Sequence, residues 1–126
     1  MREIIAIIRP NKIGTTKEVL AAAGFPSLTA ARVQGRGKQK GLFVELNQPA
    51  QGPGLSQGDS LETRRMEFIP KRAITLIVED SAVRQVVDLI MAVNRTGHVG
   101  DGRIFVCPLE EAVRIRTAET GNEAIL

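Results

Sequence analysis

The pattern that most constrains this chain is a strand–helix–strand unit that occurs twice, on either side of a long stretch without periodicity. The first unit predicts a strand over residues 2–9, a helix over 12–23 and a strand over 28–34. The second predicts a strand over 73–78, a helix over 83–94 and a strand over 103–107. A strand followed by a helix and a returning strand must bury one face of the sheet against the helix.

Short apolar runs and one clear helical period carry these predictions. The run IIAII at residues 4–8 is β-branched and nearly unbroken, typical of a central strand, and Pro10 ends it. Asn11 is the expected N-cap of the first helix, and Gly24 is the expected residue after its last turn. Apolar residues at 83, 86, 87, 90 and 91 give the second helix its 3.6-residue period.

Two such units close most simply into one ferredoxin-like βαββαβ domain of the α+β class, spanning residues 1–126. Its antiparallel sheet would carry both helices on one face. Leu, Ile and Val supply most large side chains, so we expect other subunits to cover the opposite face. A long surface loop is predicted from residue 45 to about 68, and it contains a possible short helix over 61–66. The end of the chain is predicted as a short strand over 112–117 and a loose tail over 117–126.

A glycine-rich basic stretch stands between the first unit and the long loop: Gly35, Arg36, Gly37, Lys38, Gln39, Lys40 and Gly41. Glycine lets backbone amides approach a ligand closely, and neighbouring cations neutralise an anion held there. The stretch therefore suits a polyphosphate. It lacks the spacing of the common phosphate loops, and a solvated hairpin remains the alternative interpretation.

A second glycine-rich loop, residues 95–103, contains Gly100, Asp101, Gly102 and Arg103. In this topology both glycine-rich segments reach one rim of the sheet. Arg114 and Arg116 alternate along the predicted last strand, so both would project from one face and share an anion. Asp101 between two glycines is most simply a turn residue. The two arginines have an alternative, which is pairing with Glu110, Glu111 or Glu119.

Lys71 follows Pro70 at the exit of the long loop, opposite Gln39 and Lys40 at its entrance. Together these residues could hold a carboxylate effector, and the Gln39 oxygen suits a hard cation such as Mg²⁺. A surface lysine is the alternative for Lys71.

Several functional classes are excluded or disfavoured. One cysteine, Cys107, and one histidine, His98, cannot build a Cys/His zinc site or an internal disulfide. No apolar run approaches the length of a membrane span and no secretion signal begins the chain, so we expect a cytoplasmic protein. The net charge of +3 is modest and locally concentrated, which favours an anionic ligand over nucleic acid.

Five segments, in order along nearly the whole chain, closely resemble the PII nitrogen-regulatory signal-transduction proteins. They are residues 35–41 (GRGKQKG), 69–71 (IPK), 95–97 (RTG), 100–106 (GDGRIFV) and 115–117 (IRT). The pattern TGxxGDG[KR]IFV is the most specific of them.

The resemblance implies a ferredoxin-like trimer that binds ATP or ADP competitively between subunits. It also implies 2-oxoglutarate bound with Mg²⁺ beside ATP, and a T-loop, about residues 37–69, that acts on target proteins. By matching motif, the nucleotide would be held by Thr29, the 35–38 backbone (Gly35, Arg36, Gly37, Lys38), Ile77, Gly100, Asp101, Gly102, Arg103, Arg114 and Arg116. Gln39, Lys40 and Lys71 would hold 2-oxoglutarate, with Gln39 also at the metal.

Departures from the common PII pattern indicate which branch of the family this chain resembles. The chain has no tyrosine, so uridylylation or adenylylation of a loop tyrosine is chemically unavailable. The loop is longer than is usual, Arg36 replaces a common aromatic, and Lys38 replaces a common arginine. With residues 24–29, these features resemble the nitrogenase-associated branch, whose members switch nitrogenase off under ammonium, often as mixed complexes of two PII-like chains.

Alternative functions remain open at this stage. The target could be an ammonium transporter or a nitrogen-assimilation enzyme rather than nitrogenase. RNA-recognition modules share the topology but stack bases on exposed strand aromatics, whereas this chain has four Phe and no Tyr or Trp. No residue is placed as a base for water, so we expect a regulator with at most incidental ATP hydrolysis rather than an enzyme.

Overall fold

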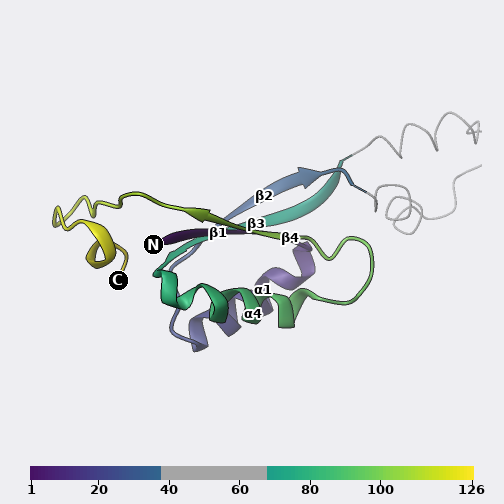
Figure 1. Cartoon of the computed structure of the whole chain (residues 1–126). Helices are drawn as coiled ribbons and strands as arrows, with labels where there is room; N and C mark the ends of the chain where they lie inside the picture. The colour runs from purple at the N-terminus through teal and green to yellow at the C-terminus, as the bar shows by residue number, and fades with distance from the viewer. Residues whose placement is uncertain (38–67) are drawn as a thin grey trace, which may run out of the picture.

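The centre of the sheet is formed by β1 (Arg2–Ile8) and β3 (Ile69–Val78). The structure is a computed structural model that describes residues 1–37 and 68–126. Its sheet has the order β2-β3-β1-β4, with β2 (Thr29–Gly35) and β4 (Arg103–Pro108) at the edges and every neighbouring pair antiparallel. Both helices, α1 (Ile13–Ala22) and α4 (Val83–Asn94), lie on one face (Figure 1). The ferredoxin-like prediction is therefore confirmed.

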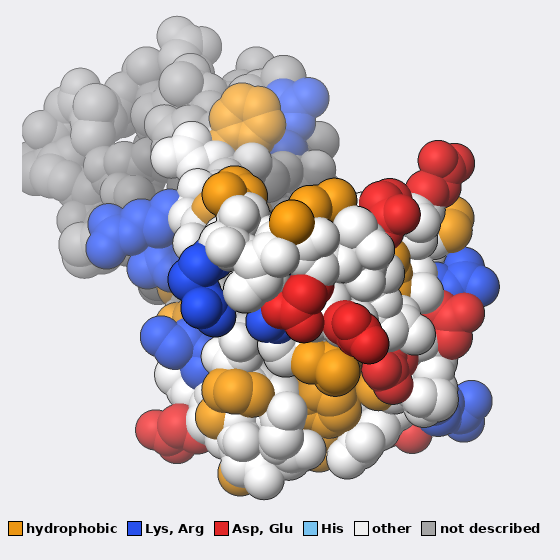
Figure 2. Space-filling model, turned by 90° about the vertical axis from the view of Figure 1, so that its left-hand side faces the viewer, with side chains coloured by type: hydrophobic (Ala, Val, Ile, Leu, Met, Phe, Trp, Pro, Cys, Tyr) orange, Lys and Arg blue, Asp and Glu red, His pale blue; other side chains and the backbone are white. Residues whose placement is uncertain are grey.

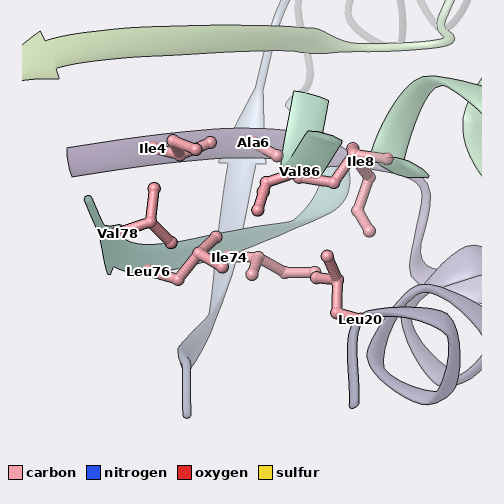
Figure 3. Close-up of a cluster of buried hydrophobic side chains, with 9 residues drawn as sticks. Ile4, Ala6, Ile8, Leu20, Ile74, Leu76, Val78 and Val86 are labelled. Atoms are coloured by element: carbon pink, nitrogen blue, oxygen red, sulfur yellow. The ribbon is translucent and has the colours of Figure 1, made fainter. Parts of the chain in front are cut away.

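The core lies between the helices and one face of the two central strands (Figure 3). Alternate residues of each strand are buried, as expected for a sheet covered on one side. The fully or almost fully buried apolar side chains of this cluster are Ile4, Ala6, Ile8, Leu20, Ile74, Leu76, Val78, Val86 and Ile90. Burial of each large side chain contributes about 1.5–3 kcal/mol, which makes this layer the main source of stability.

The predicted C-terminal end of α1 is confirmed, and its predicted N-terminal cap is not. Gly24 has φ +97° and closes the helix: its amide donates to the Ala21 carbonyl at 3.1 Å, and the Phe25 amide donates to Leu20 at 2.8 Å. This is a Schellman motif, which needs a left-handed residue. The prediction of Asn11 as N-cap was wrong, because residues Pro10–Lys12 form a 3-10 turn (η1) and the helix begins at Ile13 without a side-chain cap.

Strand β3 begins at Ile69 rather than at residue 73. It continues past the end of β1, whose last partner is Arg72, and pairs with β2 as far as Gly35 opposite Ile69. Pro70 is tolerated there because a strand lies on only one side of it. Lys71 is therefore a residue of the sheet, and not of the loop exit. The predicted hairpin arm over 42–46 and helix over 61–66 lie outside the described residues.

The predicted strand over 112–117 was wrong. Within the described part of the chain, the strand pairing of Val113 is limited to an isolated bridge with Thr120. The chain then turns over residues 115–117, where the Ala118 amide donates to the Arg114 carbonyl at 2.7 Å. The alternating residues that suggested a strand do not bury an apolar face, since Ile115 is 99% exposed. The tail carries a 3-10 helix, η3 (Gly121–Ile125).

The sheet face opposite the helices is apolar at its centre. The register places Ile5 between Thr75 and Phe105, and Ile7 between Ala73 and Arg103. Phe105 is 46% exposed on this face. Coverage by other subunits remains a prediction. Within residues 1–37 and 68–126, no helix combines the length and the apolar character that crossing a membrane requires.

Candidate functional site

The described part of the first glycine-rich segment, residues 35–37, and the second glycine-rich loop meet at one end of the sheet, where the chain leaves β2, enters β3 and enters β4 (Figure 1). There they line a pocket of about 500 Å³. Of the residues predicted to hold ligands, this pocket brings together Gly35, Arg36, Gly37, Lys71, Gly100, Asp101, Gly102 and Arg103. The expectation that both segments reach one rim is confirmed. Lys38, Gln39 and Lys40 lie outside the described residues.

Asp101 fixes the shape of the loop between α4 and β4. Its carboxylate accepts hydrogen bonds from the Thr96 amide at 2.8 Å, the Gly97 amide at 2.9 Å and the Thr96 hydroxyl at 2.5 Å. The Arg9 guanidinium also donates to it, at 2.6 Å. The Thr96 hydroxyl, then Arg9, and then the two amides hold the pKa of Asp101 well below its usual range. The carboxylate is thus charged and committed to the loop itself.

Gly102 sets how closely this loop packs on the sheet. Its φ is +104°, and a Cβ atom built on it would lie 1.8 Å from the Ile7 carbonyl oxygen. Only glycine fits there, for both conformational and steric reasons. Gly100, with φ +102°, gives the loop a second left-handed residue on the pocket wall. Two such turns beside Arg103 leave backbone and guanidinium groups suited to an anion.

Two cations brace the loop from the sheet. Arg9, just after β1, donates to the Val99 carbonyl at 3.1 Å as well as to Asp101. Lys71 is buried and donates from Nζ to the Gly100 carbonyl at 2.8 Å. Burial lowers the pKa of Lys71, the nearby Arg9 lowers it further, and Asp101 opposes both. Arg9 was not among the residues predicted from the sequence, where its one signal is a cation directly after a central strand.

A cation–aromatic contact lies where the chain leaves β2 and enters β3, at the two ends of the long loop. Arg36 lies over the ring of Phe68, 5.9 Å from its centroid, where β2 and β3 stop pairing. This is within the range of a cation–π interaction. The contact ties the two strands together next to the pocket.

The remaining predicted nucleotide residues lie at the other end of the sheet. Thr29, Ile77 and Arg114 line a second pocket of about 590 Å³, together with residues 124–126 of the tail. Figure 1 places the tail at the opposite end from the loop that carries Asp101. Strand β2 has seven residues, so its first and last residues are roughly 20 Å apart. One chain therefore splits the predicted nucleotide site into two halves.

Arg114 is engaged by the tail. Its guanidinium donates to the Glu119 carboxylate at 3.0 Å and to the backbone oxygens of Glu123 at 3.2 Å and Leu126 at 2.5 Å. The alternative pairing with Glu119 is thus found, and the shared strand face proposed for Arg114 and Arg116 is not. Arg116 is exposed in the turn and lines neither pocket. Figure 2, viewed from this end, shows acidic side chains directly beside basic ones rather than a continuous basic surface.

Comparison with known proteins gives concordant matches along the chain. The family model described as nitrogen regulatory protein P-II matches residues 1–119. The nitrogen fixation nifHD region GlnB-like protein 2 of Methanobacterium ivanovii is 55% identical, over 100% of both chains. The nitrogen regulatory protein P-II of Cereibacter sphaeroides is 39% identical, over 99% of this chain and 100% of that protein. The crystal structure of Arabidopsis thaliana PII bound to citrate superposes with a TM-score of 0.72 and 27% identity, covering 98% of this chain and 88% of the other.

Proposed function

Because this chain belongs to the nitrogen regulatory protein P-II family, we propose that it reports nitrogen and energy status to a target protein. In this proposal it binds ATP and ADP competitively, and it binds 2-oxoglutarate with Mg²⁺ in the ATP state. The loop between β2 and β3, about residues 37–69, then acts on the target. Proteins of this family are regulators rather than enzymes, so the output is binding and not turnover.

The observation that carries the proposal is the division of the predicted nucleotide residues between the two ends of one sheet. One end supplies the backbone of Gly37 and Gly100, and the other supplies Thr29, Ile77 and Arg114. A nucleotide cannot reach both within one chain, because they lie roughly 20 Å apart along β2. In a ring of three chains, the first end of one copy would meet the second end of the next. The apolar face around Ile5 and Phe105 would then be buried between copies.

The first pocket is suited to the phosphates. Its wall combines the backbone of Gly35, Gly37, Gly100 and Gly102 with the guanidinium groups of Arg36 and Arg103. Amides in left-handed turns and planar guanidinium groups are the usual partners of phosphate oxygens. Lys38 would add charge from the adjacent loop, and Arg116 would do so from the neighbouring copy.

The 2-oxoglutarate subsite is proposed at Lys71, with Gln39 and Lys40. Lys71 lines the same pocket as the residues proposed to hold the phosphates, so a dicarboxylate held by it would adjoin the nucleotide. Mg²⁺ prefers oxygen ligands, which the Gln39 side chain, 2-oxoglutarate and the phosphates would together provide. Citrate, the ligand named for the Arabidopsis PII structure, is itself a polycarboxylate.

For the target we propose nitrogenase, switched off under ammonium. The names of the similar methanogen proteins refer to a nitrogen fixation region, which supports this choice over an ammonium transporter or a nitrogen-assimilation enzyme. A mixed complex with a second PII-like chain is an alternative to a homotrimer. A pull-down from cells with ADP, compared with ATP plus 2-oxoglutarate and read by mass spectrometry, decides between the targets. Recovery of an ammonium channel in place of nitrogenase would redirect the assignment.

The ligand scheme is tested by isothermal titration. ATP and ADP should displace one another, and 2-oxoglutarate should bind only when ATP and Mg²⁺ are present. Equal binding of 2-oxoglutarate with and without ATP would contradict the proposed coupling, because the coupling free energy between the two ligands would then be zero.

A further inference from the structure

Arg114 makes an ion pair and three hydrogen bonds within its own chain. Three acceptors surround its guanidinium, and all of them belong to residues 119–126: the Glu119 carboxylate and the backbone oxygens of Glu123 and Leu126. Three of the five N–H donors of the guanidinium, including both on Nη2, are used in these contacts, and its charge is paired with Glu119. A phosphate oxygen that approached it would have to replace these contacts.

The acid in this contact is held in place by its own turn. The Thr117 hydroxyl donates to the Glu119 carboxylate at 2.6 Å, and the Arg114 amide donates to the Glu119 carbonyl at 2.9 Å. The base of the turn is closed by the Gly121 amide, which donates to the Glu111 carboxylate at 2.9 Å and to the Ala112 carbonyl at 3.1 Å. Glu119 therefore faces Arg114 because of local geometry.

The end of the same segment also lines the second pocket. Ala124, Ile125 and Leu126 form part of the wall of the pocket that contains Thr29, Ile77 and Arg114. A ligand that used this half of the site would meet both the carboxylate of Glu119 and the apolar end of the tail.

We propose that residues 119–126 are an internal competitor for Arg114, and that a nucleotide phosphate binds to Arg114 only after it displaces this segment. The inference rests on the proposed function, since it assumes a nucleotide at Arg114. The side chains of Arg114 and Glu119 are 30% and 38% exposed, and ion pairs this open to water are weak. A multiply charged phosphate, which can bind a guanidinium through two oxygens, is a stronger partner. The tail thus raises the nucleotide concentration at which the site fills.

The test compares ATP binding to the wild-type chain, Glu119→Gln and a matched control, Glu123→Gln. Both variants lose one negative charge from the same segment, but the carboxylate of Glu123 makes no ion pair or hydrogen bond within residues 1–37 and 68–126. Competition predicts that Glu119→Gln binds ATP about two- to fivefold more tightly, the range expected for loss of an exposed pair. Glu123→Gln should equal wild type. Weaker binding by Glu119→Gln would mean that Glu119 aligns Arg114 for the ligand, and equal binding would mean that the pair does not compete with it. Either result would overturn the inference.

A second measurement uses the wild-type chain alone. Saturating ATP should speed hydrogen exchange at the amides of Ala118 and Gly121, whose bonds close the turn. Unchanged or stronger protection, with ATP bound, overturns the competition and leaves the proposed nucleotide site standing. If neither wild type nor Glu119→Gln binds ATP at millimolar concentration, the proposed function fails and the inference fails with it.

Discussion

Arg9 and Asp101 are 92 positions apart in the chain and are joined by a 2.6 Å ion pair at the edge of the first pocket. The pair connects the end of β1 to the loop that forms the pocket wall. The second Arg9 donor reaches the Val99 carbonyl, and Lys71 reaches Gly100, so three contacts from the sheet determine where this loop lies. The pocket is therefore shaped by groups that the sequence spreads over nearly its whole length.

Replacing Arg9 with alanine should loosen this loop without unfolding the sheet. The amides of Thr96 and Gly97, which donate to Asp101, should exchange roughly tenfold faster, because a loop that has lost its brace opens locally. Hydrogen exchange read by NMR or mass spectrometry measures this. Asp88→Asn is the control, since its pair with Arg84 is exposed on a helix surface and away from the loop. Unchanged exchange in Arg9→Ala would show that the ion pair does not brace the loop.

The lowered pKa of Asp101 predicts how the loop responds to acid. A carboxyl group whose pKa is lower in the folded state stabilises that state above its unfolded pKa, and the stabilisation is lost as pH falls through the folded pKa. Protection of the Thr96 and Gly97 amides should therefore persist well below pH 4, the usual range of an aspartate. Protection that is lost near pH 4 would mean that the carboxylate does not hold these amides in solution. Asp101→Asn should remove the protection at all pH values.

Gly102→Ala should destabilise the fold by at least about 2 kcal/mol, since it combines a strained φ with overlap at the Ile7 carbonyl. Chemical denaturation gives the free energy of unfolding. Gly14→Ala is the matched control, because a Cβ atom at this position in α1 meets nothing within 4 Å. The control should be neutral or more stable by about 0.5 kcal/mol. Equal stability of the two variants would mean that the loop is not packed against β1.

Phe105→Asp tests whether the apolar face of the sheet is an interface between copies. If other copies cover this face, a charge on it is incompatible with assembly, so wild type is expected to run as a trimer in light scattering and the variant as a single chain. Met91→Asp is the control: it has similar exposure, 42% against 46%, but stands on α4 on the other side of the sheet. Assembly that survives Phe105→Asp would place the interface elsewhere.

Lys71→Met should abolish the binding of 2-oxoglutarate. ATP binding, measured without 2-oxoglutarate, should weaken only by the loss of one hydrogen bond to the loop, about 1 kcal/mol, because Arg9 still braces the loop. The change removes the ammonium proposed for the carboxylate and retains most of the volume of a buried side chain. Titration calorimetry with each ligand separates the two effects. Retained binding of 2-oxoglutarate would remove Lys71 from the proposed subsite.

The sequence predicted the sheet and both helices because their apolar periodicity is local and strong. The helix over 83–94 was predicted with the bounds found, and Gly24 marked the end of α1 through a left-handed turn that few other residues adopt. The prediction that both glycine-rich segments reach one rim followed from topology alone. These are features that a few neighbouring residues or the order of elements can fix.

Other features depend on contacts between distant residues, and the sequence did not reveal them. Alternating Val113, Arg114, Ile115 and Arg116 had the period of a strand. Among residues 1–37 and 68–126, however, no strand pairs with them beyond one bridge, and the segment turns back on itself. The role of Arg9 depends on Asp101, which no local pattern connects to it. The strand was predicted to begin at residue 73, after Pro70, yet β3 begins at Ile69, where Pro70 pairs on one side with β2 and its missing amide donor is tolerated.

Strand β2 begins with Thr29 in one pocket and ends with Gly35 in the other. In a closed ring of such chains, β2 of each copy would contact two bound nucleotides, one at each end of the strand. Binding at one cleft could then change the affinity of the next cleft through the seven residues of β2. This coupling between neighbouring sites would not require any helix to move.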